Sequence, residues 1–166
     1  MIRPLTPADE AAYRQLWAMA IGEHAERFRT DPADDAPAGI PTSFADDSWT
    51  LGAFDGDRLV GIVSVEREPW AKLRHKALLS RMFIHPESAG SGLGKVLLHE
   101  ALIRATQVAD LRQIWLTVLE TNEPAQRLYA SAGFRSYAHE PEAVRIGDRY
   151  VAELQMVRFL RRERRD

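Results

Sequence analysis

Short runs of apolar residues alternate along the chain with polar segments that contain Gly, Pro or Asp. Runs of this kind, rich in Val, Ile, Leu and aromatic residues, are typical of β-strands. Two of them flank Asp55-Gly56-Asp57, a tight-turn signal that predicts a hairpin. In all, the pattern predicts strands over 1–5, 49–54, 58–66, 76–84, 113–118, 134–139 and 150–159.

Capping signals mark the ends of two predicted helices. Thr6 is a hydroxyl N-cap that is followed by a proline and, three positions after the cap, by an acid; apolar residues then recur at helical spacing until Gly22. Asn122 is the predicted N-cap of a helix that begins at Glu123. The helix that it begins is expected to stop at Gly133, because glycine is the usual residue just after a helix.

A longer amphipathic helix is expected over 93–109, with its apolar residues on one side apart from two exceptions. It joins the strands predicted at 76–84 and 113–118, and such a strand–helix–strand connection makes the two strands parallel. The sequence therefore predicts an α/β (α+β) fold: a mixed, mostly antiparallel sheet of about six to seven strands with helices on both faces. The length of 166 residues predicts a single domain over 1–166.

The composition argues against several kinds of site and partner. Lys and Arg number 22 against 24 Asp and Glu, so the net charge of −2 gives no general attraction to nucleic acid or to an anionic membrane. The absence of cysteine rules out disulfides, thiolate metal sites and a cysteine nucleophile. The first residues do not resemble a signal peptide, and the longest apolar run, near 59–63, is far shorter than a membrane helix. We therefore expect a soluble, cytoplasmic protein without nucleic-acid or membrane partners.

Residues 30–57 differ from the rest of the chain, because they contain seven aspartates and neither Lys nor Arg. Their prolines and Gly39 prevent long regular elements. The segment is interpreted as a solvated loop or, alternatively, as an acidic rim that attracts a cationic substrate. The Arg-rich stretch 161–165 is interpreted as a solvated, frayed end of the chain, with a nucleic-acid-binding arm as the alternative.

Glycine is most concentrated at 85–95, between a predicted strand and a predicted helix, and we call these residues the glycine turn. Because Gly90, Gly92 and Gly94 alternate with other residues, successive backbone N–H groups can point into one concavity that an anion can approach without meeting a Cβ atom. The helix N-terminus adds a partial positive charge at the same place. The turn is therefore expected to hold a phosphate or a pyrophosphate.

Spacing excludes three familiar motifs for this turn. A P-loop requires glycine where Ala89 stands and a hydroxyl where Val96 stands. A dinucleotide-binding fingerprint requires glycine at the position of Lys95. A nucleophile elbow centred on Ser91 requires glycine at the positions of Ala89 and Leu93. A turn that merely joins strand to helix stays an alternative.

Three blocks of residues follow one another: Arg81-Met82-Phe83-Ile84-His85-Pro86, then Gly90-Ser91-Gly92-Leu93-Gly94, then Asn122-Glu123-Pro124-Ala125 with Leu128-Tyr129 and Gly133-Phe134. In this combination they resemble the GNAT superfamily of N-acetyltransferases. The order of predicted elements is similar over nearly the whole chain, and the specific motifs lie between about 80 and 134. The run 150–156 is also similar to the last strand of many members.

The resemblance implies acetyl-CoA as the cofactor. Its pyrophosphate would lie on the backbone of the glycine turn, and its pantetheine would pair with the preceding strand and contact Asn122. The residues expected to bind it are Met82, Phe83, Ile84, Ala89, Gly90, Ser91, Gly92, Leu93, Gly94, Lys95 and Asn122. Since Ala89 stands where the family usually has Arg or Gln, a side-chain contact to phosphate is expected to be lost, while the backbone contacts remain.

Acetylation of an amine requires two proton transfers. A lysine-like amine has to lose a proton, at a cost of about 4 kcal/mol near neutral pH, and the leaving thiolate has to gain one. The resemblance places the Tyr129 hydroxyl near the sulfur, and a phenol stays protonated at neutral pH and can donate. Tyr129 is therefore the predicted catalytic residue, with simple helix packing as the alternative.

The sequence assigns no general base. The candidate carboxylates are interpreted as surface or salt-bridged groups: Glu66, Glu68, Glu120 and Glu153. No metal site is expected, because Ile103 stands where the pair His99-Glu100 would need its second histidine.

The predicted function is transfer of an acetyl group from acetyl-CoA to a primary amine of a small molecule or peptide. Since no cysteine can carry the acetyl group, direct transfer in a ternary complex is favoured. The alternatives are a non-catalytic acyl-CoA-binding or regulatory module on the same fold and a protein that binds another nucleotide. Trp70, in a connecting turn, is the candidate for a substrate pocket, whereas Trp115 is expected in the core. The resemblance is also compatible with a homodimer.

Overall fold

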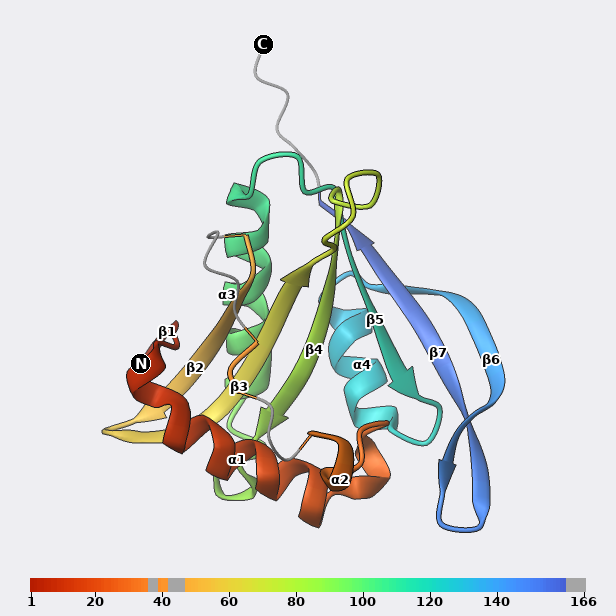
Figure 1. Ribbon diagram of the computed structural model, residues 1–166, viewed down its shortest axis with the longest axis horizontal. Helices are drawn as coiled ribbons and strands as arrows, with labels where there is room; N and C mark the ends of the chain where they lie inside the picture. Colours follow the sequence, from red (N-terminus) through yellow and green to blue (C-terminus); the bar gives the residue numbers. More distant parts are fainter. Residues whose placement is uncertain (36–38, 42–46, 161–166) are drawn as a thin grey trace.

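The computed structural model describes residues 1–35, 39–41 and 47–160, which are built around a seven-stranded sheet (Figure 1). The strands are β1 (Ile2–Pro4), β2 (Trp49–Asp55), β3 (Arg58–Arg67), β4 (Lys76–Ile84), β5 (Gln113–Leu119), β6 (Arg135–Ile146) and β7 (Arg149–Phe159). Their spatial order is β1-β2-β3-β4-β5-β7-β6, and neighbours are antiparallel except for the parallel pair β4 and β5. The predicted mixed, mostly antiparallel sheet is confirmed.

Helices cover both faces of this sheet, as expected (Figure 1). They are α1 (Glu10–Glu23), α2 (Pro32–Asp35), α3 (Leu93–Gln107) and α4 (Glu123–Ser131). Successive residues of a strand point to opposite faces, so a strand that is covered on both sides has to be apolar throughout. In β3, Ile62 joins the core beneath α1, while Val63 and Val65 join the core beneath α3.

The predicted helix ends are close to the observed ones. The backbone N–H of Thr6 donates to the Asp9 carboxylate at 2.8 Å, across a 3₁₀ turn that leads into α1. The Asn122 side chain caps α4, and Gly133 follows that helix in the left-handed conformation, at φ 87°. Helix α3 ends at Gln107, two residues before the expected end.

The hairpin of β6 and β7 is longer than the sequence predicts. Strands are expected over 134–139 and 150–159, whereas β6 continues to Ile146 and the chain turns at Gly147. Most side chains of β6 are exposed, so they lack the alternation that identifies a half-buried strand. Backbone pairing with β7, for example between Val144 and Val151, forms this part of the ribbon.

Two interpretations lie outside the described residues: the frayed stretch 161–165, and Asp46 in the acidic segment. Within the described part of the chain, no helix has both the length and the apolar character needed to cross a membrane.

Candidate active site

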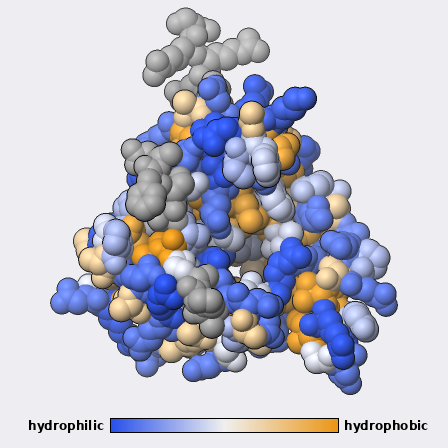
Figure 2. Space-filling view, viewed as in Figure 1, coloured by the Kyte–Doolittle hydropathy of each residue, from blue (hydrophilic) through white to orange (hydrophobic). Residues whose placement is uncertain are grey.

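The parallel strands β4 and β5 open a cleft in the middle of the sheet. They pair over 76–78 and 113–115 and diverge beyond these residues (Figure 1). The cleft has a volume of about 760 Å³, and Figure 2 shows this face of the molecule hollowed near its centre. An unpaired strand edge offers its backbone N–H and C=O groups to an extended ligand. The second half of β4, residues 80–84, presents such an edge and lines the cleft.

A β-bulge interrupts β4 where it borders the cleft. The register between β3 and β4 shifts between Ile62 and Ser64, and Arg81 adopts a φ of 54°, which is uncommon for a residue with a side chain. A bulge bends its strand and re-aims the side chains that follow it. Here the side chains that follow it are Met82, Phe83 and Ile84, and all three line the cleft.

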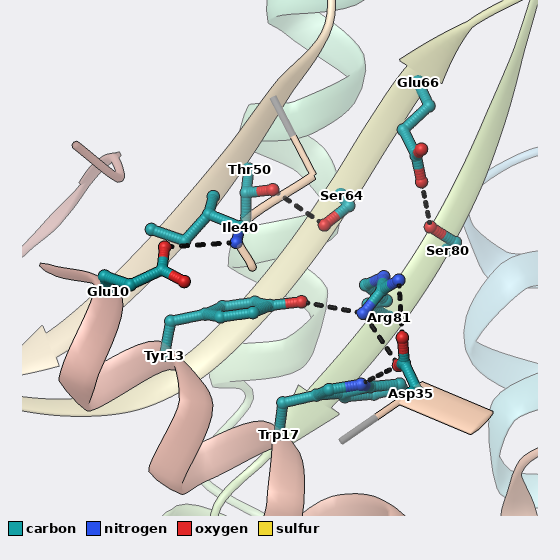
Figure 3. A network of polar contacts seen from close by, with 10 residues as sticks. All are labelled: Glu10, Tyr13, Trp17, Asp35, Ile40, Thr50, Ser64, Glu66, Ser80 and Arg81. Carbon is teal, nitrogen blue, oxygen red and sulfur yellow. Dashed lines mark hydrogen bonds and ion pairs between the residues drawn. The ribbon is translucent and has the colours of Figure 1, made fainter. Parts of the chain in front are cut away.

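Residues of α1 and α2 hold Arg81 at the bulge (Figure 3). The guanidinium donates to both carboxylate oxygens of Asp35, at 2.9 and 3.2 Å, and to the Tyr13 hydroxyl at 3.0 Å. The Trp17 indole N–H donates to the same carboxylate. Bidentate arginine–carboxylate pairs are among the stronger hydrogen-bonded contacts in proteins. This network therefore ties α1 and α2 to the edge of the cleft, and no local pattern in the sequence indicates it.

The hypothesis of an acidic rim is wrong for two of the aspartates. Asp35 is the buried partner of Arg81, so its charge is neutralised within the fold. Asp47 lies 3.7 Å from the Arg67 guanidinium and also pairs with Arg74. Both carboxylates hold the structure together, and neither offers a free charge to a cationic substrate.

The glycine turn borders the cleft, and its backbone is open. Gly90 and Gly92 have φ values of 76° and 81°, and a Cβ atom added at either position would meet no described atom within 4 Å. Among the described residues, the backbone N–H groups of Gly90, Ser91 and Gly92 have no hydrogen-bond acceptor. Helix α3 begins directly afterwards, at Leu93. Unpaired N–H groups without obstructing side chains, at the start of a helix, are suited to bind an anion.

The structure brings nearly all the predicted binding residues together. Those that line the cleft are Met82, Phe83, Ile84, Ala89, Gly90, Gly92, Leu93, Gly94, Lys95 and Asn122. Ser91 is the exception, because its hydroxyl donates to the Ser88 carbonyl oxygen at 2.7 Å and so points back into the turn. The side-chain amide oxygen of Asn122 accepts from the backbone N–H of Ala125 at 3.3 Å, so the NH₂ group of the same side chain remains available to the cleft.

Tyr129 reaches the cleft from α4. Its side chain is 7% exposed and packs edge-on against Phe134, with ring centroids 5.9 Å apart. Burial raises the pKa of the Tyr129 phenol well above its usual range. The hydroxyl therefore stays protonated at neutral pH, so it can act as a donor and is unsuited to accept a proton as a base.

The four carboxylates that the sequence singled out have different surroundings. Glu120 is exposed and lies 3.0 Å from His139, and Glu68 lies just beyond the end of β3. Glu66 lines the cleft and accepts from the Ser80 hydroxyl at 3.0 Å (Figure 3). Glu153 also lines the cleft but is only 2% exposed.

The burial of Glu153 could not be predicted from the sequence, and the reason lies in its neighbours. Its neighbours Ala152 and Leu154 are apolar, so alternation along the strand predicts that Glu153 faces solvent. In the structure that face of β7 is covered, and Arg29 lies 3.5 Å from the carboxylate. Burial raises the pKa of Glu153, which Arg29 and a hydrogen bond from Thr117 partly offset.

The two tryptophan predictions are wrong. Trp70 is 70% exposed, in the loop between β3 and β4, and does not line the cleft. Trp115 lines the cleft and is half-buried, because β5 lacks its β4 neighbour just beyond this residue.

The comparisons with known proteins agree with this geometry. The model of the acetyltransferase (GNAT) family matches residues 11–134. The chain belongs to this family. Among solved structures, a GCN5-related N-acetyltransferase from Kribbella flavida is similar, with a TM-score of 0.82, 26% identity, and coverage of 96% of this chain and 97% of that one. The Salmonella typhimurium protein yncA, solved with its cofactor acetyl-CoA, has a TM-score of 0.82 at 20% identity, with coverage of 98% and 95%.

Curated relatives of this GNAT chain are similar over part of their length. A mycothiol acetyltransferase from Actinosynnema mirum is 32% identical over 130 residues, which are 76% of this chain and 41% of that protein. An uncharacterized N-acetyltransferase from Mycobacterium tuberculosis is 34% identical over 82 residues, 49% of this chain and 51% of that protein. The chain thus spans about half the length of the curated relatives it matches, or less.

Proposed function

We propose that this GNAT chain transfers an acetyl group from acetyl-CoA to a primary amine, directly and within a ternary complex. The proposal depends on one observation: two features with different chemical roles line the same cleft. One is the glycine turn, whose unpaired N–H groups are suited to a pyrophosphate. The other is Tyr129, a buried and protonated phenol.

Three parts of the chain would bind the cofactor, one at its pyrophosphate and two along its pantetheine arm. The N–H groups of Gly90 and Gly92 would bind the pyrophosphate, since no side chain stands in the way. The free edge of β4 at 82–84 would pair with the amides of the pantetheine arm, as an added strand does. The side-chain oxygen of Asn122 already caps α4, and the NH₂ group of the same side chain would donate to the pantetheine arm.

When bound, acetyl-CoA supplies the activated acetyl thioester. Tyr129 would donate a hydrogen bond to the sulfur as negative charge develops there, and this stabilisation is available because burial keeps the phenol protonated. Arg81 would act indirectly: by fixing the bulge in β4 it positions the edge of the strand that the cofactor contacts.

The alternative is a module on the same fold that binds acyl-CoA without catalysis. Ala89 favours this alternative to a degree, because its methyl group offers no polar contact to a phosphate. The placement of Tyr129 in the cleft favours the enzyme, since binding alone does not need a protonated phenol beside the ligand.

Release of free thiol from acetyl-CoA, measured with a panel of primary amines, tests the proposal. Because one curated relative, from Vibrio cholerae, is a spermidine N(1)-acetyltransferase, the panel includes spermidine beside an aminoglycoside and a lysine-containing peptide. We expect turnover with at least one amine, and a fall in kcat of about 100-fold or more for Tyr129→Phe, with acetyl-CoA affinity unchanged. Tyr137→Phe is the matched control, because Tyr137 is 55% exposed on β6.

Acetyl-CoA binding without turnover of any amine would favour the non-catalytic module. Full activity in Tyr129→Phe would refute the role of the phenol while leaving the cofactor site in place.

A further inference from the structure

Glu153 is a buried carboxylate with an unsatisfied oxygen. It is 2% exposed, and its Oε2 atom has no hydrogen-bond partner among the described residues. A buried carboxylate oxygen without a donor is costly, because it has lost water and gained no hydrogen bond in return. Since this oxygen belongs to a residue that lines the cleft, a ligand in the cleft can supply the missing donor.

The pairing of the strands shows that the Glu153 side chain lies on the face of the sheet that α3 does not cover. Glu153 pairs with Leu119 of β5, and alternate residues of β5, such as Leu116 and Val118, join the core beneath α3. Leu119 and Glu153 therefore point to the other face. The charged or polar groups that act on the carboxylate there are Arg29 from the segment before α2, Thr117 of β5 and Glu140 of β6.

Arg29 is a loose partner for this carboxylate. Its guanidinium nitrogen lies 3.5 Å from Oε2, and the side chain is 57% exposed. The pair of Arg81 and Asp35 in the same molecule shows the contrast, with two hydrogen bonds at 2.9 and 3.2 Å and little exposure. An exposed arginine gains little from a long contact and is easily displaced.

We propose that Glu153 binds the primary ammonium group of the amine substrate, and that Arg29 occupies this place until the substrate displaces it. The inference rests on the proposed function, and it adds the side chain that recognises the amine, which is bound in its protonated form before the reaction. An ammonium group is compact and carries three donors, so it can reach an oxygen in a recess where a planar guanidinium stays 3.5 Å away. Arg29 then sets the affinity by competing with the substrate for one carboxylate.

Amine binding in the presence of saturating CoA, which lacks the acetyl group, tests this without turnover. The probes are spermidine and butylamine, with butanol as the uncharged control, and binding is followed by calorimetry. We expect Arg29→Gln to bind both amines at least threefold more tightly than the wild type and Glu153→Gln to bind them at least tenfold more weakly. In the double variant the gain from Arg29→Gln should disappear, because the carboxylate for which the two cations compete is gone.

Arg27→Gln is the matched control. Arg27 lines the same cleft two residues before Arg29, but it lies 3.4 Å from Glu26 rather than near Glu153. We expect amine affinity within twofold of the wild type. An equal gain in amine affinity in Arg27→Gln and Arg29→Gln would mean that the loss of any positive charge in the cleft strengthens binding, and it would overturn the proposal.

Equal amine affinity in the wild type, Arg29→Gln and Glu153→Gln would also overturn it, as would the absence of amine binding in all three. The Arg29 side chain is 57% exposed, so we expect Arg29→Gln to fold. Its amine affinity therefore tests the proposal even if Glu153→Gln fails to fold. Failure of the proposed function is a separate result: the wild type then binds no CoA, or it binds acetyl-CoA but releases no thiol with any amine of the panel.

Discussion

Substitution of Gly94 by alanine should move stability and cofactor affinity in opposite directions. Gly94 is the second residue of α3, and its backbone is not in the left-handed region. An added Cβ would lie 3.5 Å from Cγ1 of Ile84 and 3.6 Å from Cε of Met82, which is ordinary van der Waals contact. The methyl group therefore fits the free protein, yet it enters the space beside two residues that line the cleft.

The two magnitudes follow from this position. Alanine is favoured over glycine inside a helix by up to about 1 kcal/mol, and in the first turn we expect about half of that. The melting temperature should then rise by about 1–2 °C. If the methyl group displaces the cofactor far enough to break one N–H···phosphate hydrogen bond, the loss is about 1.5–3 kcal/mol, or roughly 10–150-fold in Kd.

Thermal unfolding and calorimetric titration with acetyl-CoA measure the two effects in the same samples. Gly22→Ala is the matched control: Gly22 lies in α1, a Cβ there meets nothing within 4 Å, and the variant should gain stability without losing affinity. A Gly94→Ala protein that is stabilised and still binds acetyl-CoA with wild-type affinity would refute our placement of the cofactor beside α3.

The remaining predictions concern charge and backbone strain. Asp35→Asn leaves Arg81 without its countercharge, so the free energy of unfolding, measured with urea, should fall by about 2–3 kcal/mol; a change below about 0.5 kcal/mol would contradict the network. Because burial raises the pKa of Glu153, the folded state holds this proton more tightly than the unfolded state, and stability should fall as pH rises from about 4.5 through the raised pKa. Glu153→Gln should remove that fall in stability. An identical pH dependence of stability in the wild type and Glu153→Gln would contradict the raised pKa of Glu153. Gly90→Ala and Gly56→Ala each put a side chain at positive φ without a clash, so both should lose about 1–2 kcal/mol of stability, but only the first should lose acetyl-CoA affinity in the titration.

Features with a local signal were predictable from the sequence. The caps at Thr6 and Asn122, the hairpin at 55–57 and the glycine turn each depend on a few neighbouring residues, and the structure has all of them. The parallel pair β4 and β5 also followed, because a helix between two strands leaves few other arrangements.

Contacts between distant segments were not predictable in the same way. Asp35 and Arg81 are 46 residues apart, and nothing near either one indicates its partner. The acidic stretch suggested solvated charges, because composition does not show which carboxylates meet an arginine in the fold. Trp115 was expected in the core for a related reason: an apolar strand shows no sign that its neighbour diverges beside it.

The central claim is that the glycine turn binds acetyl-CoA, and calorimetric titration of Gly92→Glu tests it most directly. Gly147→Glu is the control, because Gly147 has a similar backbone conformation, with φ values of 64° against 81°, and lies in the turn between β6 and β7. We predict that the wild type and Gly147→Glu bind acetyl-CoA in preference to ATP and NAD, and that Gly92→Glu does not bind it. Unchanged acetyl-CoA binding by Gly92→Glu, or no binding by the wild type, would contradict the account.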